Sequence, residues 1–84
     1  MVTLRFFASL REVLGVEDEN IELPSGVLTI HQLTEWLEQR GGQWTTALRE
    51  NRSIHVAVNQ QIVSRQMAVA DGDEVAYFPP MTGG

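Results

Sequence analysis

The chain has 84 residues, a formal charge of −5 at neutral pH and no cysteine. This length fits one small domain, and the lack of cysteine excludes disulfides and thiolate metal sites. The acidic balance argues against nucleic acid, because affinity for a phosphate backbone depends on lysine and arginine. No apolar run reaches the roughly 20 residues of a spanning helix. We therefore expect a soluble, cytoplasmic protein that binds neither nucleic acid nor a membrane.

The first fifteen residues predict a strand and then a short helix. Phe7 falls on the outward phase of this strand. Ser9 and Glu12 have the spacing of a capping box, and Gly15 suits the residue after a helix. The expected inward positions of the strand are Val2, Leu4, Phe6 and Ala8, and those of the helix are Leu10, Val13 and Leu14.

The middle of the chain predicts a second strand and two helices. Ile21 and Leu23 have strand spacing, and the proline after them ends the strand. Thr29 and Gln32 form a second capping box, and a pair of glycines ends the helix that follows. Residues 43–50 predict a further short helix. The expected core positions of the two helices are Ile30, Leu33, Trp36, Leu37, Trp44, Ala47 and Leu48.

The last third of the chain predicts a hairpin and a final strand. Apolar residues alternate from Ile54 to Val58, and Asn59 with Gln60 permits a tight reversal into a second arm at 62–63. Another turn leads into a last strand from Glu74 to Phe78.

Strands at both ends with a long helix between them predict an α+β fold, in which one mixed sheet packs on a principal helix. This architecture matches a ubiquitin-like β-grasp. We expect the domain to cover residues 1–78 and residues 79–84 to form an extended, flexible tail.

Few residues within the expected domain suggest chemistry. His31 and His55 are far apart in the sequence, so no metal site is predicted. The carboxylates of Asp71, Asp73 and Glu74 are better explained by a turn, in which aspartates bind nearby backbone amides. No nucleophile elbow, phosphate-binding glycine loop or cysteine nucleophile is present. We therefore expect that this chain is not an enzyme by itself.

The C-terminal end is the strongest functional candidate. Pro79 and Pro80 fix the backbone and remove two hydrogen-bond donors, which ends the strand and sets the direction of exit. The tail consists of Pro79, Pro80, Met81, Thr82, Gly83 and Gly84. It spans at most about 20 Å, enough to enter the active site of another protein.

Glycine at the end of the chain has a chemical use as well. Without Cβ atoms, Gly83 and Gly84 fit a narrow channel and leave the terminal carboxylate open to attack. A carboxylate is a poor electrophile and needs activation, which ATP supplies through an acyl-adenylate. Sulfur could then be held as a terminal thiocarboxylate, so the reactive group would be the C-terminus of Gly84.

Three stretches carry a family resemblance: "LRFFASLREVLG", "VNQQIV" and "DGDEVAYFPPMTGG". They resemble the small subunits of molybdopterin synthase, the MoaD-type sulfur carriers of the ThiS/MoaD family, over essentially the whole chain. Met81 stands where this family commonly shows a β-branched residue.

The resemblance implies a β-grasp protein in molybdenum cofactor biosynthesis that binds no cofactor stably. Its Gly84 is adenylated by a ubiquitin-activating-like adenylyltransferase that consumes ATP, and it is thiocarboxylated with sulfur from a donor protein. Gly84 then enters the catalytic large subunit and gives its sulfur to cyclic pyranopterin monophosphate. The implied complex holds two small and two large subunits, and the small subunit is the non-catalytic sulfur donor.

A partner surface is also predicted. Phe7 and Phe78 are out of phase with the inward residues of the first and last strands. Those strands are neighbours in a β-grasp, so the two phenylalanines would lie together on the exposed side of the sheet. Aromatic patches anchor interfaces. We expect Phe7, Phe78 and the tail to dock on both the large subunit and the activating enzyme.

Other functions remain open. A sulfur carrier of thiamine biosynthesis shares the fold and the Gly-Gly end, but such carriers are usually shorter and lack the "FPP" exit. A ubiquitin-like modifier would form isopeptide bonds with lysines of other proteins. This chain has no lysine and could not extend itself in that way. A plain interaction module with an incidental tail is the last alternative.

Overall fold

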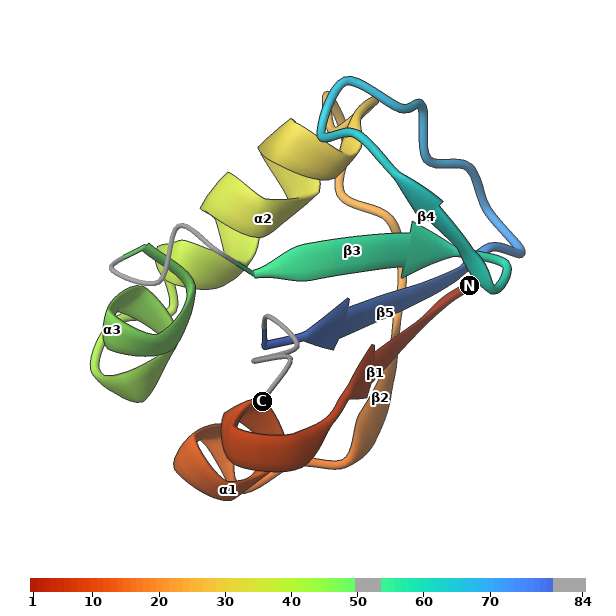
Figure 1. Ribbon diagram of the computed structural model, residues 1–84. Helices are drawn as coiled ribbons and strands as arrows, with labels where there is room; N and C mark the ends of the chain where they lie inside the picture. The colour runs from red at the N-terminus through yellow and green to blue at the C-terminus, as the bar shows by residue number, and fades with distance from the viewer. Residues whose placement is uncertain (50–53, 80–84) are drawn as a thin grey trace.

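The computed structural model describes residues 1–49 and 54–79. The elements are β1 (Val2–Phe6), α1 (Ala8–Leu14), β2 (Asp18–Ile21), α2 (Ile30–Glu38), α3 (Gln43–Arg49), β3 (His55–Val58), β4 (Gln61–Val63) and β5 (Glu74–Phe78) (Figure 1). Glu50 and the tail residues 80–84 lie outside the described residues, so the division into a domain and a tail stays a prediction. No helix in the described ranges has the length and apolar character needed to cross a membrane.

The five strands form one mixed sheet in the order β2-β1-β5-β3-β4. Its centre is the parallel pair of β1 and β5, in which Leu4 lies opposite Val75. The other three pairings are antiparallel. The first and last strands lie side by side, as predicted (Figure 1), so β5 leaves the domain from the middle of the sheet.

The core lies between the inward face of the sheet and the helices. Its most deeply buried side chains are Tyr77, Phe6, Leu4, Ile30, Leu33, Leu37, Val2, Val75 and Thr34. The apolar stripe predicted for α2 is confirmed, and the two tryptophans pack against the core while half-buried. The fold is therefore the predicted α+β sheet on a principal helix.

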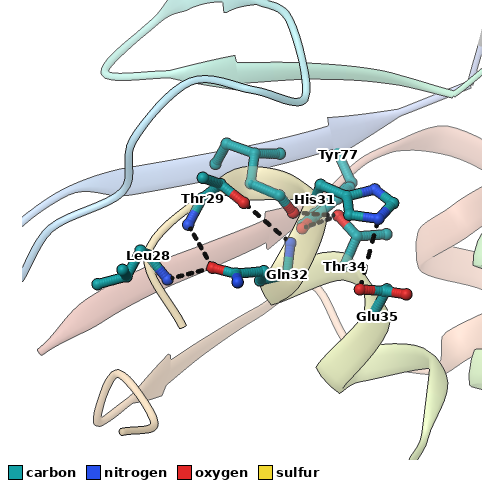
Figure 2. Close-up of polar contacts among 8 residues, drawn as sticks. Leu28, Thr29, His31, Gln32, Thr34, Glu35 and Tyr77 are labelled. Atoms are coloured by element: carbon teal, nitrogen blue, oxygen red, sulfur yellow. Dashed lines mark hydrogen bonds and ion pairs between the residues drawn. The ribbon is translucent and has the colours of Figure 1, made fainter. Parts of the chain in front are cut away.

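The N-terminus of α2 is capped by side chains that are close to it in the sequence. The Thr29 hydroxyl oxygen accepts from the Gln32 backbone N–H at 3.2 Å, and the Gln32 side-chain oxygen accepts from the Thr29 N–H at 3.2 Å (Figure 2). The same oxygen accepts from the Leu28 N–H at 2.7 Å. The predicted capping box is confirmed, and it satisfies amides that the first helical turn leaves unpaired.

The start of α1 differs from the prediction. Phe7, not Ser9, is the N-cap, and no side chain caps the helix. The reason is tertiary: the Phe7 N–H donates to the Tyr77 carbonyl at 3.1 Å. This bond extends the sheet to residue 7 and leaves Ser9 already inside the first turn. Gly15 ends α1 with φ at +72°, as predicted, and its N–H donates to the Arg11 carbonyl.

Three smaller expectations were wrong at the edges of elements. Ala8 and Val13 are exposed, because α1 turns only Leu10 and Leu14 toward the core. The second strand ends at Ile21, and Leu23 packs on the core from the following loop.

A polar cluster ties β2 to the helices. The Arg40 guanidinium donates two hydrogen bonds to the Glu19 carboxylate, at 2.9 and 2.7 Å. It lies 5.0 Å from the Trp36 ring centroid and 4.6 Å from that of Trp44. The hydrogen-bonded guanidinium lowers the pKa of Glu19 below its usual value. Trp44 in turn meets the Phe6 ring edge-on at 5.3 Å, so this cluster helps fix the helices against the sheet.

Candidate functional site: the root of the tail and the outer face of the sheet

The root of the tail is the end of β5. This strand ends at Phe78, as predicted, and Pro79 follows half-buried. The residue before Phe78 anchors the strand, because the Tyr77 side chain is fully buried and its hydroxyl lies 2.8 Å from the Thr34 hydroxyl (Figure 2). Burial raises the pKa of Tyr77 to about 12. The exit point therefore belongs to a rigid central strand.

The structure does not describe the tail residues to which a function is assigned. Pro80, Met81, Thr82, Gly83 and Gly84 lie outside the described residues. Their proposed chemistry depends on the sequence and on what surrounds the exit point.

The two phenylalanines predicted for an interface border this exit. Phe7 is 40% exposed, and the Arg5 guanidinium lies 5.5 Å from its ring centroid. Phe78 is half-buried because its ring stacks on that of His55, with centroids 5.7 Å apart and planes at 29°. Both residues lie on the outward phase of adjacent strands, as the sequence predicted. Their role in docking stays a prediction.

The outer face also holds apolar residues that the sequence did not single out for function. Ala57 and Ala76 lie opposite one another on β3 and β5, and Ile62 lies opposite Ala57 on β4. Both alanines are less than 10% exposed although they face away from the core, whereas Ile62 is 69% exposed. In the register of the sheet, these small side chains lie between the larger ones of Phe78, His55 and Ile62.

We call this surface the docking strip. It consists of Phe7, Phe78, His55, Ala57, Ala76 and Ile62. Its charged border on β1 and β5 is an ion pair between Arg5 and Glu74 at 3.7 Å. The strip combines aromatic side chains, small apolar side chains and a charged border, residue types that are common in protein–protein interfaces.

The acidic turn is structural, as predicted. The Asp73 carboxylate accepts from the Ala70 N–H at 2.9 Å and from the Asn59 side-chain amide at 3.0 Å. The Asn59 side-chain oxygen Oδ1 accepts from the Glu74 N–H at 3.0 Å. Asp71 forms an ion pair with the terminal ammonium of Met1. These bonds lock the start of β5 to the predicted reversal, where Asn59 and Gln60 have φ of +50° and +72°.

The two histidines lie on different elements and do not form a pair. His31 lies on α2 with its Nε2 3.4 Å from a Glu35 carboxylate oxygen (Figure 2), and His55 lies on the outer face of the sheet. Within residues 1–49 and 54–79, no group of three or more histidine, aspartate and glutamate side chains could hold a metal ion.

Two hollows in the described surface lie away from the exit. One of about 270 Å³ is lined by Glu35, Glu38, Gln39, Gly41, Thr45 and Arg49. Another of about 190 Å³ is lined by Asn59, Gln60 and Glu74. Both are polar and neither contains a residue of the docking strip.

A family model described as ThiS family matches residues 4–84. The chain belongs to the ThiS family. It is 40% identical to the molybdopterin synthase sulfur carrier subunit of Haemophilus influenzae and 37% identical to that of Escherichia coli K12, over the whole length of both chains in each case. Among solved structures it is similar to a putative molybdopterin converting factor, subunit 1, from Pyrococcus furiosus. That match has 32% identity and a TM-score of 0.75 and covers 95% of this chain and 97% of the other.

Few side chains of the described domain suggest chemistry. In the described residues, the sequence motifs of this chain serve its architecture: the acidic turn places the start of β5 and the buried tyrosine holds its end. The outer face of the sheet is a part of the described structure to which these motifs assign no architectural role.

Proposed function

We propose that this chain is the sulfur carrier subunit of a molybdopterin synthase, with the carboxyl group of Gly84 as its working group. The observation that carries this proposal is the full-length match, at 40% identity, to a protein of that name. The position of the tail supports it, because the last residues follow the central strand of the sheet. A rigid root and a narrow tether suit delivery of a terminal group to another protein.

The chemistry takes place at the end of the backbone. A terminal carboxylate oxygen attacks the α-phosphorus of ATP on the activating enzyme, and pyrophosphate leaves as the acyl-adenylate forms. The terminal sulfur of a persulfide on the donor protein then displaces AMP and forms an acyl disulfide with Gly84. A thiol of the donor or of the activating enzyme attacks the donor's sulfur in this disulfide, so that a protein disulfide forms and the thiocarboxylate of Gly84 is released. In the large subunit, this sulfur is transferred to cyclic pyranopterin monophosphate. The domain contributes binding and reach, and the catalytic side chains belong to the partners.

The test of this function compares three forms of the full chain. Loading with ATP, activating enzyme and sulfur donor is expected to change the intact mass by the replacement of one oxygen with sulfur. The thiocarboxylated form is expected to support molybdopterin formation by the large subunit, whereas the unmodified chain is not. A chain with one residue added after Gly84 is the control, and sulfur delivery by that chain would disprove the role of the terminus.

The same experiment separates the alternatives. A loaded chain that supplies sulfur to thiamine synthesis but not to the large subunit would indicate the thiamine-pathway carrier. A stable adduct on lysines of other proteins would indicate a modifier.

Docking is the second part of the proposal. The docking strip and the tail are proposed to contact both the large subunit and the activating enzyme. Truncating a central aromatic anchor typically weakens an interface by more than about 1 kcal/mol, or roughly fivefold or more. We expect losses of this size for Phe7→Ala and Phe78→Ala. Leu28→Ala is the matched control, because Leu28 is 67% exposed and lies outside the strip.

Titration calorimetry with each partner measures these affinities. Because Phe78 is half-buried, its variant is first shown to be folded by urea denaturation. Unchanged affinity of both phenylalanine variants for both partners would refute the docking proposal. The proposed role of Gly84 would not be affected by that result.

A further inference from the structure

Three aromatic side chains link the polar cluster of Arg40 to the root of the tail. The Trp44 ring on α3 meets the Phe6 ring edge-on, with centroids 5.3 Å apart. Phe6 in turn stacks on Tyr77, with centroids 5.8 Å apart and planes at 13°. We call Trp44, Phe6 and Tyr77 the aromatic column. It begins at a half-buried side chain on a helix and ends at the penultimate residue of β5.

The outer end of the aromatic column is held by Arg40. Its guanidinium carbon lies 4.6 Å from the Trp44 ring centroid and 5.0 Å from that of Trp36. Two hydrogen bonds to Glu19 fix the guanidinium in this place. The Arg40 and Glu19 side chains are only 25% and 30% exposed, and partial removal of water strengthens contacts between a cation and an aromatic ring. Arg40 therefore restrains the one ring of the column that is not fully buried.

The inner end of the aromatic column is the end of the central strand pair. Phe6 and Tyr77 are register partners on β1 and β5. The next contact along these strands is the bond from the Phe7 N–H to the Tyr77 carbonyl at 3.1 Å. Because strand ends open at a lower free energy than strand centres, looser packing of Phe6 on Tyr77 would free this bond first.

We propose that Arg40 is a positioning residue for the root of the tail. Through Trp44 and Phe6 it keeps the end of β5 closed, so that this strand stays paired with β1 as far as Tyr77. Without this restraint the end of β5 would open more often, and the residues that leave the sheet would lengthen the tether. The inference goes beyond the proposed function, because it concerns the free chain and does not depend on the chemistry of Gly84.

Native-state hydrogen exchange of the full-length chain, followed by NMR, tests this role. Two amides that donate to carbonyls at opposite ends of β5 are compared: Phe7 N–H, bonded to Tyr77, and Asn59 N–H, bonded to Glu74 at 2.8 Å. Arg40→Met removes the charge and keeps a long, unbranched side chain. We expect exchange at Phe7 to accelerate at least about fivefold more than exchange at Asn59, which is the size of a lost ion pair together with its ring contacts.

Two further variants make the comparison specific. Arg11→Met is the matched control, because it makes the same substitution in an exposed pair, in which Arg11 lies 3.9 Å from Glu17. We expect it to change exchange at either amide by less than about twofold. Glu19→Gln keeps Arg40 and removes its charged partner, so the same selective acceleration at Phe7 should appear at a smaller size. This milder variant decides the question if Arg40→Met does not fold.

The outcomes separate a local role from a general one. Equal acceleration at Phe7 and Asn59 would mean that Arg40 serves only the overall stability, and it would overturn the inference. Unchanged exchange at Phe7, or an equal acceleration there in Arg11→Met, would overturn it as well. Loading of Gly84 with sulfur is measured separately, so a failure of the proposed function leaves the exchange result and its interpretation in place.

Discussion

The buried hydroxyl pair between α2 and β5 allows a sharp test of how the exit strand is held. The Thr34 hydroxyl has one hydrogen, which it donates to the Ile30 carbonyl at 2.8 Å. The Tyr77 hydroxyl, also 2.8 Å from the Thr34 oxygen, must therefore be the donor of the second bond. Both side chains are less than 2% exposed, so water cannot replace either partner.

Thr34→Val keeps the shape of the side chain and removes the only acceptor identified for the Tyr77 hydroxyl. A buried polar group left without a partner costs about 1–3 kcal/mol. For a domain of this size, each kcal/mol lowers Tm by roughly 4–8 °C. We expect Thr34→Val to lower the free energy of unfolding by about 2 kcal/mol, measured by urea denaturation, with a matching fall in Tm.

The controls are Tyr77→Phe and the double variant. Tyr77→Phe removes the donor and leaves the bond from Thr34 to Ile30 intact, so we expect a loss of less than about 1 kcal/mol. In the double variant no hydroxyl is left unpaired, so it should be more stable than Thr34→Val alone. Additive losses in this double-mutant cycle would refute the reasoning, because independent sites add and coupled ones do not.

Three further predictions follow from described contacts. Burial raises the pKa of Tyr77 to about 12, whereas an unfolded tyrosine titrates near 10. The contribution of the neutral Tyr77 hydroxyl to the free energy of unfolding should therefore be fully present below about pH 10. It should fall by up to about 2–3 kcal/mol as pH rises to about 12. Tyr77→Phe should abolish this alkaline loss in denaturation curves. Asn59→Ala removes the side-chain bonds to Asp73 and Glu74 and places alanine at positive φ, so calorimetry should show a loss of about 2 kcal/mol. Asn59→Gly should recover about 1 kcal/mol of this loss, and equal stability of the two variants would exclude backbone strain at residue 59. Hydrogen bonding to Arg40 lowers the pKa of Glu19. The stabilisation that the Glu19–Arg40 pair adds to the free energy of unfolding should therefore be present above about pH 4.3, and it should disappear as pH falls through the lowered pKa of Glu19. We therefore expect Glu19→Gln to cost at most about 1 kcal/mol at pH 7 and to match the unaltered chain near pH 2, with tryptophan fluorescence following the unfolding.

Local patterns in the sequence predicted most of the secondary structure. The capping box of α2, the reversal at Asn59 and Gln60 and the last strand from Glu74 to Phe78 all form where they were expected. Each of these features depends on residues within a few positions of one another. Periodicity also predicted which face of β1 and β5 is buried, because alternation needs no knowledge of the partner strands.

One error and one omission have the same cause, which is contact between residues that are distant in the sequence. The N-cap of α1 moved to Phe7 because its amide is held by Tyr77, a contact across 70 positions of the chain. The pair of Thr34 and Tyr77 was missed because a lone threonine in a helix gives no local sign of a partner on a strand.

The candidate site shows the same division. The proline exit and the glycine end were evident in the sequence, and so were the outward phases of Phe7 and Phe78. The remaining residues of the docking strip, His55, Ala57, Ala76 and Ile62, required the order and register of the strands. Alternation along a strand determines which side chains share a face, but only the pairing of strands determines which of them are neighbours. That pairing is decided by burial and hydrogen bonding over the whole sheet, so the surface around the tail exists only in the tertiary structure.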